Sequence, residues 1–185
     1  RGRAAMLEPP LPVERPEREV SESAFLFLSA EMASSLRDRV GCDAAKEQMH
    51  MVGFTTGLRL ATRLAAGRFP ITAERSAMKY VCKELWSFLF RKPANRLQTD
   101  RRGNYIIQDA AFRWLEPLSA ASGNKDELQE VAMLHLAFPC GIIRGALLAL
   151  GVECSVSAEV SAAAMPACSF TVALKSTEES AADVA

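Results

Sequence analysis

Residues 43–66 constrain the fold most, because they follow a helical period yet are apolar around more than half of the helix circumference. One face carries Met49, Gly53, Thr56, Gly57, Leu60 and Leu64, and a second face carries Met51, Phe54, Leu58, Ala61 and Ala65. A helix of this kind is expected to be buried on two sides. Gly53 and Gly57 each cost about 1 kcal/mol relative to alanine inside a helix, which a close backbone approach can offset. That approach fits either a crossing within the chain or an interface with a partner.

A first helix is predicted over residues 22–40, with Phe25, Leu28, Met32 and Leu36 on one stripe. Leu26 and Phe27 lie off that stripe, so the first turn carries more apolar surface than one contact needs. Apolar residues outside the core stripes are the natural anchors of an interface. The predicted partner interface consists of Leu26, Phe27, Met51, Phe54, Gly57 and Leu58.

The rest of the chain alternates between the helical period and the strand period of two. A third helix is predicted from Glu74 to about Arg91, where Pro93 ends it. A long helix is predicted from Asp126 to Leu150, with a kink or a break at Pro139. Two hairpins are predicted, at 96–109 around a turn at 100–103, and at 152–174.

These elements indicate an α+β fold in the order ααα-ββ-α-ββ, in which helices cover one face of a four-stranded antiparallel sheet made from two hairpins. Residues 1–21 are predicted to be a disordered tail, residues 22–175 a single domain and residues 176–185 a frayed tail. The longest weakly charged apolar run, 133–143, is shorter than the roughly 20 residues of a membrane span. We therefore expect no membrane-spanning segment.

The charge balance means that an electrostatic partner would need a local patch of charge. The 22 basic and 22 acidic residues cancel, so no global field favours nucleic acid or an anionic membrane. A local basic cluster is predicted from Arg91, Lys92, Arg96, Arg101 and Arg102. A solvated hairpin edge is the first interpretation of this cluster, an acidic protein or membrane surface the second, and RNA the last.

Signatures of catalysis are absent from the sequence. It contains no phosphate-binding glycine loop, dinucleotide fingerprint or nucleophile elbow. The two histidines and five cysteines lack the paired spacings of a zinc site. The cysteines fall in apolar stripes, where burial raises the pKa of a thiol and lowers its reactivity. We therefore predict no catalytic residue, no metal, no cofactor and no enzyme activity, and favour a structural role for the cysteines over thiol catalysis.

Five separated blocks resemble the small α/β subunits of the TRAPP vesicle-tethering complex, most of all the subunit-six branch. The blocks are MVGFTTGLR at 51–59, MKYVCKELW at 78–86, LQTDRRGNYIIQD at 97–109, LAFPCGIIRGA at 136–146, and EVS with MPACSF within 159–170. The structural motif residues that this resemblance supplies are Trp86, Gly103, Tyr105, Asp109, Cys140, Gly141, Arg144 and Gly145. The match extends over about 25–175 in the order of the family.

The resemblance implies a heterodimer, built largely through the first helices, with the acylated small subunit of the same complex. It also implies contacts with other TRAPP subunits and, only through the assembly, with a Rab GTPase for which the whole complex is the nucleotide exchange factor. The implied location is cytoplasmic and peripheral at Golgi and ER-to-Golgi membranes.

Two departures from the family pattern stand out. Residues 65–75 contain no cysteine, so we expect no acylation at the position that the acylated subunit uses. Pro139 stands where a helical serine or threonine is usual. A small apolar-ligand (lipid) binding module of the same fold is the alternative function.

Overall fold

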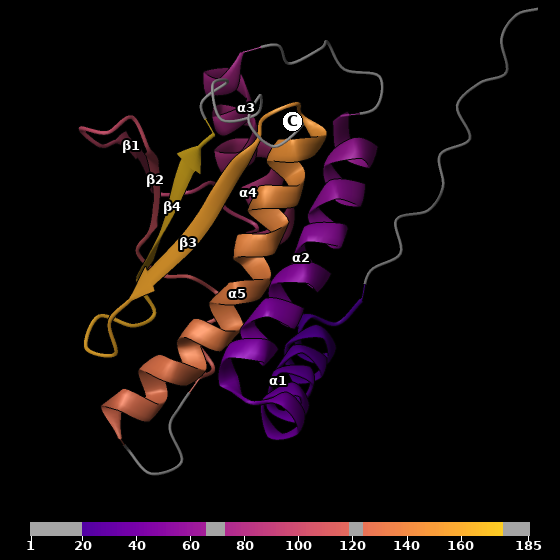
Figure 1. The fold of residues 1–185 in the computed structure, drawn as a ribbon, viewed down its shortest axis with the longest axis vertical. Coiled ribbons are helices and arrows are strands. Elements are labelled where there is room, and N and C mark those ends of the chain that lie inside the picture. The colour runs from indigo at the N-terminus through magenta and orange to yellow at the C-terminus, as the bar shows by residue number, and fades with distance from the viewer. Residues whose placement is uncertain (1–19, 66–72, 119–123, 176–185) are drawn as a thin grey trace, which may run out of the picture.

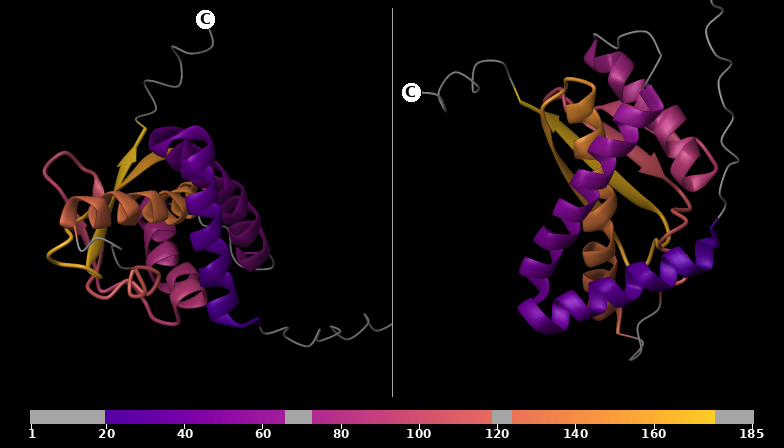
Figure 2. Two further views of the ribbon diagram at one scale, coloured as in Figure 1. Left: turned by 90° about the horizontal axis from the view of Figure 1, so that it is seen from below. Right: turned by 90° about the vertical axis from the view of Figure 1, so that its right-hand side faces the viewer.

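The first two helices form one outer side of the molecule. A computed structural model describes residues 20–65, 73–118 and 124–175. Of the predicted tails, residues 1–19 of the 1–21 segment and all of 176–185 lie outside these ranges. Helix α1 (Glu22–Val40) joins helix α2 (Cys42–Ala65) through Gly41. The right-hand panel of Figure 2 shows α1 and α2 meeting at an angle on the near side.

The third predicted helix is continuous but not uniform. It runs through α3 (Glu74–Tyr80), a π-helical turn (Val81–Leu85) and α4 (Trp86–Phe90). It ends at Arg91, which has a left-handed φ of 60° two residues before Pro93. The wider turn keeps most of its residues on the buried side, because Val81, Cys82 and Leu85 are all buried.

Helix α5 (Lys125–Ala149) is the central element and runs unbroken through Pro139. Pro139 has no N–H, so the carbonyl of His135 loses its helical hydrogen bond. Figure 1 shows that the axis of α5 bends but does not break, so the predicted bend is confirmed and the alternative of two helices is wrong. By length and composition alone α5 could cross a membrane, but most of its apolar window is buried inside the fold. Its place in the core accounts for its hydrophobicity.

Four antiparallel strands form the sheet in the order β1-β2-β4-β3. The first hairpin pairs β1 (Arg96–Thr99) with β2 (Tyr105–Asp109), and the second pairs β3 (Cys154–Val160) with β4 (Cys168–Leu174). Pairing of β2 with β4 joins the two hairpins and places Ile107 opposite Phe170. The predicted hairpins are therefore both present.

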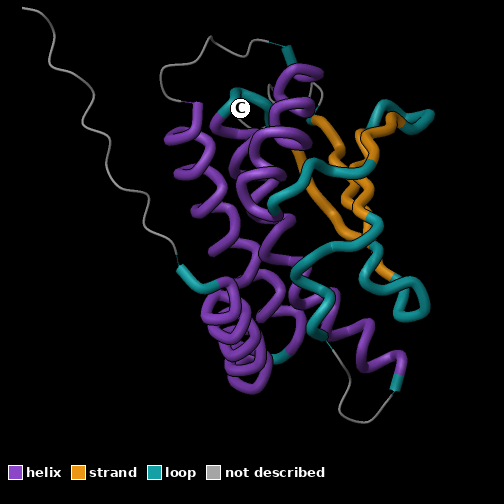
Figure 3. The backbone as a smooth tube through the Cα atoms, turned by 180° about the vertical axis from the view of Figure 1, so that it is seen from behind, coloured by secondary structure: helices purple, strands orange, loops and turns teal. Residues whose placement is uncertain are grey.

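Among the residues that the structure describes, the helices lie on one face of the sheet. Ile107, Phe170 and Val172 point to the helices and are buried, while Ser155 and Ser157 on β3 are exposed. Figure 3 shows the sheet on one side of the molecule with the helices packed beside it. This arrangement confirms the predicted α+β class.

The core between helices and sheet is rich in aromatic rings. The ring of Phe90 on α4 lies 4.8 Å from Trp86 and 4.8 Å from Phe112, measured between centroids. Phe25, on the first turn of α1, lies 4.9 Å from Trp114. The start of α1 is thus fixed to the segment that follows β2, and this contact determines which way the rest of α1 faces.

Candidate partner interface

Helix α1 exposes large apolar side chains at its N-terminal half. Phe27 is 76% exposed and Leu28 is 69% exposed, while Leu26 is half-buried. The predicted core stripe was wrong at Leu28, because Phe25, Met32 and Leu36 pack on the core and Leu28 faces outward. Exposed apolar side chains that adjoin one another mark a candidate contact surface, whereas singly scattered ones need no explanation.

Helix α2 adds a second group of exposed apolar side chains. Met51 is 47% exposed and Val52 is 43% exposed, whereas Phe54 and Leu58 are half-buried. Gly57, included among the predicted interface residues, is instead buried in the contact of α2 with α5. Exposed apolar surface on α2 is therefore concentrated around Met51.

Two pairs of glycines allow α2 and α5 to pack backbone against backbone. A Cβ at Gly53 would lie 2.1 Å from the carbonyl oxygen of Phe138, and one at Gly57 would lie 2.1 Å from that of Ile142. In return, a Cβ at Gly141 or at Gly145 would lie 2.1 Å from a carbonyl oxygen of α2. The motif glycines of both helices therefore serve a crossing within the chain, the first of the two alternatives that the sequence left open.

Arg144 and Cys140, the other motif residues of α5, take opposite positions. The guanidinium carbon of Arg144 lies 5.2 Å from the centroid of the Phe54 ring, a cation–π distance. Arg144 also lies near His50, whose pKa is lowered by burial and by this positive charge. Cys140 is buried in the core. Arg144 thus covers Phe54, which explains why Phe54 is less accessible than Met51.

A buried carboxylate joins α4 to the sheet. Asp109 is 1% exposed and accepts hydrogen bonds from Trp86 Nε1 at 2.9 Å and from the backbone N–H of Ala111 at 3.0 Å. Lys92 Nζ lies 2.5 Å from Asp109 Oδ1 and also donates to the carbonyl of Ala111. The structure therefore brings the motif residues Trp86 and Asp109 together. It also removes Lys92 from the predicted basic cluster, because its charge is used inside the fold.

The turn of the first hairpin forms as predicted. Gly103 has a φ of 86°, and Asp100 Oδ1 accepts from the backbone N–H groups of Arg102 and Asn104 at 2.7 and 2.9 Å. Burial opposes ionisation of Asp100, but the hydrogen bonds from Asn104 and Arg102 hold its pKa below the ordinary value. Tyr105 begins β2, opposite Thr99 and Val172. The motif residues Gly103 and Tyr105 therefore belong to the first hairpin and lie apart from the contacts between α2 and α5.

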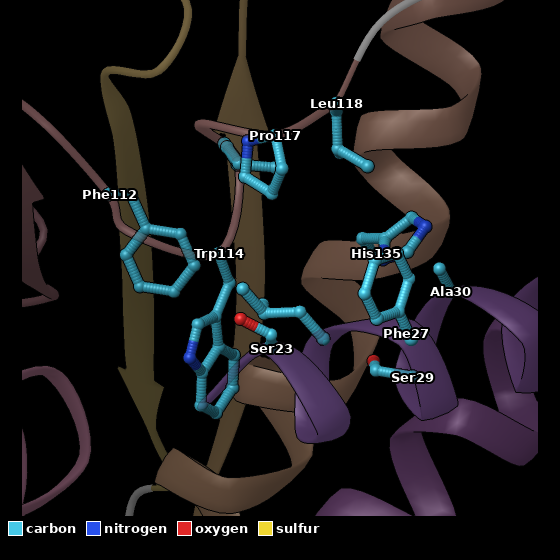
Figure 4. Close-up of a pocket in the computed structure, with 11 residues that line it drawn as sticks. Ser23, Phe27, Ser29, Ala30, Phe112, Trp114, Pro117, Leu118 and His135 are labelled. Carbon is cyan, nitrogen blue, oxygen red and sulfur yellow. The ribbon is translucent and has the colours of Figure 1, made fainter. Parts of the chain in front are cut away.

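A cavity of about 280 Å³ lies beside the exposed part of α1. Its lining is largely apolar and includes Leu26, Phe27, Trp114, Pro117, Leu118 and His135. Figure 4 shows Phe112 and Trp114 on one side of the cavity and Phe27 and His135 on the other. Burial lowers the pKa of His135. The cavity could accept an apolar side chain or a small apolar ligand.

The reactive residue types are dispersed or buried. Burial raises the pKa of Cys82 and Cys140 to about 12 and that of Cys154 to about 11, and it also raises the pKa of Cys168. Cys42 differs from the prediction, since it begins α2 and is only half-buried. Within residues 20–65, 73–118 and 124–175, no group of three His, Cys, Asp or Glu side chains could hold a metal ion. The described residues thus assemble no recognisable catalytic centre.

Sequence reasoning missed three residues that matter to these sites. Leu28 and Val52 are exposed although a helical wheel gave them no place in the interface, and Lys92 is the cation that partners Asp109. The separation of 17 residues between Lys92 and Asp109 gives no sequence signal of this ion pair. For Leu28, only the docking of Phe25 on Trp114 reveals which stripe faces inward.

Fold and surface together define a small α+β module. Helices that interlock through glycines cover one face of a four-stranded sheet, and apolar side chains are exposed on α1 and α2. The family model of the "Transport protein particle (TRAPP) component" matches residues 25–175. The chain belongs to this family.

Individual relatives agree with the family model. The chain is 36% identical to mouse trafficking protein particle complex subunit 6B over 159 residues, which is 83% of this chain and 97% of the relative. It is 40% identical to human subunit 6A over 123 residues, or 66% of this chain and 74% of the relative. These matches confirm the resemblance to the subunit-six branch.

A solved structure has the same fold. A subunit 3 of the trafficking protein particle complex from Naegleria fowleri, covalently bound to palmitic acid, aligns with a TM-score of 0.65. The alignment covers 84% of this chain and 98% of the subunit 3 chain, at 18% sequence identity. At this identity the likeness concerns the fold alone.

Proposed function

We propose that this chain is a non-catalytic structural subunit of a TRAPP-like tethering complex. The assembled complex acts as a guanine-nucleotide exchange factor for a Rab GTPase in ER-to-Golgi and Golgi vesicle traffic, and the chain works in the cytoplasm, peripherally at these membranes. The observation that carries this proposal is the exposure of Phe27, Leu28 and Met51 on the first two helices of a TRAPP family member. Aromatic and aliphatic side chains of this kind become binding anchors when a partner covers them.

The proposed partner on α1 and α2 is the acylated small subunit of the same complex. The subunit 3 that shares this fold carries a covalent palmitic acid, so small subunits of the two kinds have related shapes. This chain has no cysteine in residues 65–75 and contributes no lipid there. The pair then has one acylated and one unacylated member.

Copurification tests the interface directly. We would express the chain with the acylated small subunit and compare wild type with Phe27→Asp and Met51→Asp, which place charge on exposed positions and leave the core intact. Both variants should lose copurification while their circular dichroism is unchanged. Leu148→Asp, at an exposed position on α5, is the matched control and should still bind. Retention of the partner by a Phe27→Asp/Met51→Asp double variant would show that the interface lies elsewhere.

Activity assays test the non-catalytic role. Nucleotide release from the cognate Rab should not accelerate with this chain alone and should accelerate only when the other small subunits are present. The chain should also carry no hydroxylamine-sensitive acyl group. Exchange by the isolated chain, or a thioester on one of its five cysteines, would overturn the scaffold assignment.

A second candidate function is the binding of a small apolar ligand. The cavity beside Phe27, about 280 Å³ and largely apolar, supports it. Native mass spectrometry of the purified chain would reveal a copurifying lipid by its added mass. If Leu118→Trp, which fills the cavity from outside the predicted interface, removed that mass and left partner binding intact, the chain would be a ligand-binding module as well as a subunit.

A further inference from the structure

A second hollow, of about 670 Å³, opens where α1 begins, between α1, α2, α4 and α5. We call it the aromatic groove, and its lining includes Phe25, Leu60, Phe88, Trp114, Phe138 and Ile142. Phe88 is 53% exposed, so part of the aromatic surface faces solvent. A groove with four aromatic rings has the composition that binds extended, proline-rich chain.

The N-terminal segment of this chain is attached at the rim of the groove. Val20, the first residue described, lines the groove together with Ser21 and Glu22. Residues 1–19 are therefore tethered to the groove by one peptide bond at Val20. A short tether raises the effective concentration of a linked ligand to the millimolar range, so even a weak contact would be largely occupied.

The composition of residues 1–19 matches the groove. Residues 9–13 read Pro-Pro-Leu-Pro-Val, with a further proline at 16. Such a run favours the polyproline II conformation, which loses little entropy on binding and presents apolar side chains on a fully accessible backbone. Seven residues lie between Pro12 and Val20, so the two are eight residue steps apart, roughly 25 Å at 3.1 Å per residue, enough for the chain to reverse direction over the groove.

Charge at the rim supports the same occupant. Arg91, which ends α4, is exposed and lines the groove. It makes no ion pair with another described residue. Residues 14–19, next to Val20, carry three glutamates and two arginines, a net charge of −1 opposite in sign to Arg91. A carboxylate from this stretch can meet Arg91 when the segment folds back.

We propose that residues 9–13 of this chain occupy its own aromatic groove as an intramolecular ligand. The segment covers Phe88 and the neighbouring rings in the free subunit. The inference does not depend on the proposed interface of α1 and α2, because the groove and the exposed side of Phe27 are different surfaces.

Site-specific photo-cross-linking of the full chain tests this. We would place p-benzoylphenylalanine at Leu11, irradiate dilute protein and identify the cross-linked peptides by mass spectrometry. Cross-links within one molecule to the peptides that contain Leu60 or Phe88 are expected. Cross-links between two molecules would show that a second copy occupies the groove, and cross-links to neither peptide would show that it is open. Either result overturns the proposal.

Variants at both ends of the contact make the test specific. Phe88→Ser removes an exposed ring and should lower the yield of the intramolecular cross-link about tenfold, as loss of an aromatic anchor does. Val52→Ser, which removes a similarly exposed apolar side chain outside the groove, should leave the yield unchanged. Pro10→Gly/Pro12→Gly, outside the described core, should also lower it. Equal yields from wild type and both test variants would mean that the contact is unspecific and would overturn the proposal.

Discussion

Gly57→Ala places one methyl group between α2 and α5 where the two backbones leave no room for it. The added Cβ would lie 2.1 Å from the Ile142 carbonyl oxygen, about 1.3 Å inside the shortest ordinary van der Waals contact. It would also lie 2.7 Å from the Ile142 carbonyl carbon and Cα. These atoms belong to a helix backbone, so no side chain can rotate away and the helices must separate.

The expected change in stability is the difference between two effects. Overpacking of a core costs about 1–3 kcal/mol, and contact with backbone places this case near the upper limit. Alanine gains about 1 kcal/mol over glycine in the interior of a helix. We therefore expect Gly57→Ala to lower the free energy of unfolding by about 2 kcal/mol, a shift of roughly 4–8 °C in the melting temperature of a chain this long.

Urea denaturation followed by circular dichroism measures this change. Thr55→Ala, at an exposed position of α2 between the two glycines, is the control and should be neutral or slightly stabilising. The double variant Gly53→Ala/Gly57→Ala should lose less than the sum of the single changes, because helices that are already separated have room for the second methyl group. A gain of about 1 kcal/mol in Gly57→Ala, as helix propensity alone predicts, would refute the close crossing.

Three further outcomes follow from the sheet and the titrating groups. Gly103→Val should lower the free energy of unfolding by about 1–3 kcal/mol. A side chain at this position meets no neighbouring atom, so the cost comes from the φ of 86° alone. Gly103→Asn, measured in the same urea titration, should lose less stability than Gly103→Val. Lys92→Met removes the cation from the buried Asp109 and should cost about 2–4 kcal/mol, and an unchanged urea midpoint would show that the remaining hydrogen bonds suffice. Folding lowers the pKa values of His50 and His135 from 6.5. As the pH falls, these histidines therefore become protonated in the unfolded chain before they do in the folded chain. The stability present above about pH 6.5 is therefore lost as the pH falls through the folded values, and a double His→Gln variant with the same acid profile in thermal melts would contradict this origin.

Local patterns account for the parts of the fold that depend on neighbouring residues. The hairpin turn at Asp100 and Gly103 was predictable because a residue with positive φ and a side chain that caps the turn are both local requirements. The alternation of residues 152–160 and 168–174 likewise determines two strands, since side chains of a strand alternate between faces whatever the partner. The family blocks at 78–86 and 136–146 indicated the family, and the match of the family model over 25–175 confirms it.

Contacts between distant residues decided the rest. A helical wheel shows that α2 has two apolar faces, but only the position of α5 shows that the glycine face lies inside and that Met51 lies outside. Pro139 predicts a weak point in α5, yet burial of the surrounding helix on α2 and the sheet keeps it continuous, because packing on both sides of the proline outweighs one lost hydrogen bond.

The sequence by itself determined the class of fold, the turn chemistry and the family, because periodicity, glycine positions and motif blocks can be recognised without knowing what lies beside them. Tertiary structure alone decided which apolar residues remain at the surface and which charges are used inside. Leu28 is exposed because Phe25 packs on Trp114. Lys92 forms an ion pair because the fold brings it beside Asp109, which lies 17 residues further along the chain. The physical reason is that burial and ion pairing depend on long-range packing, which the spacing of residues along one helix or strand does not contain.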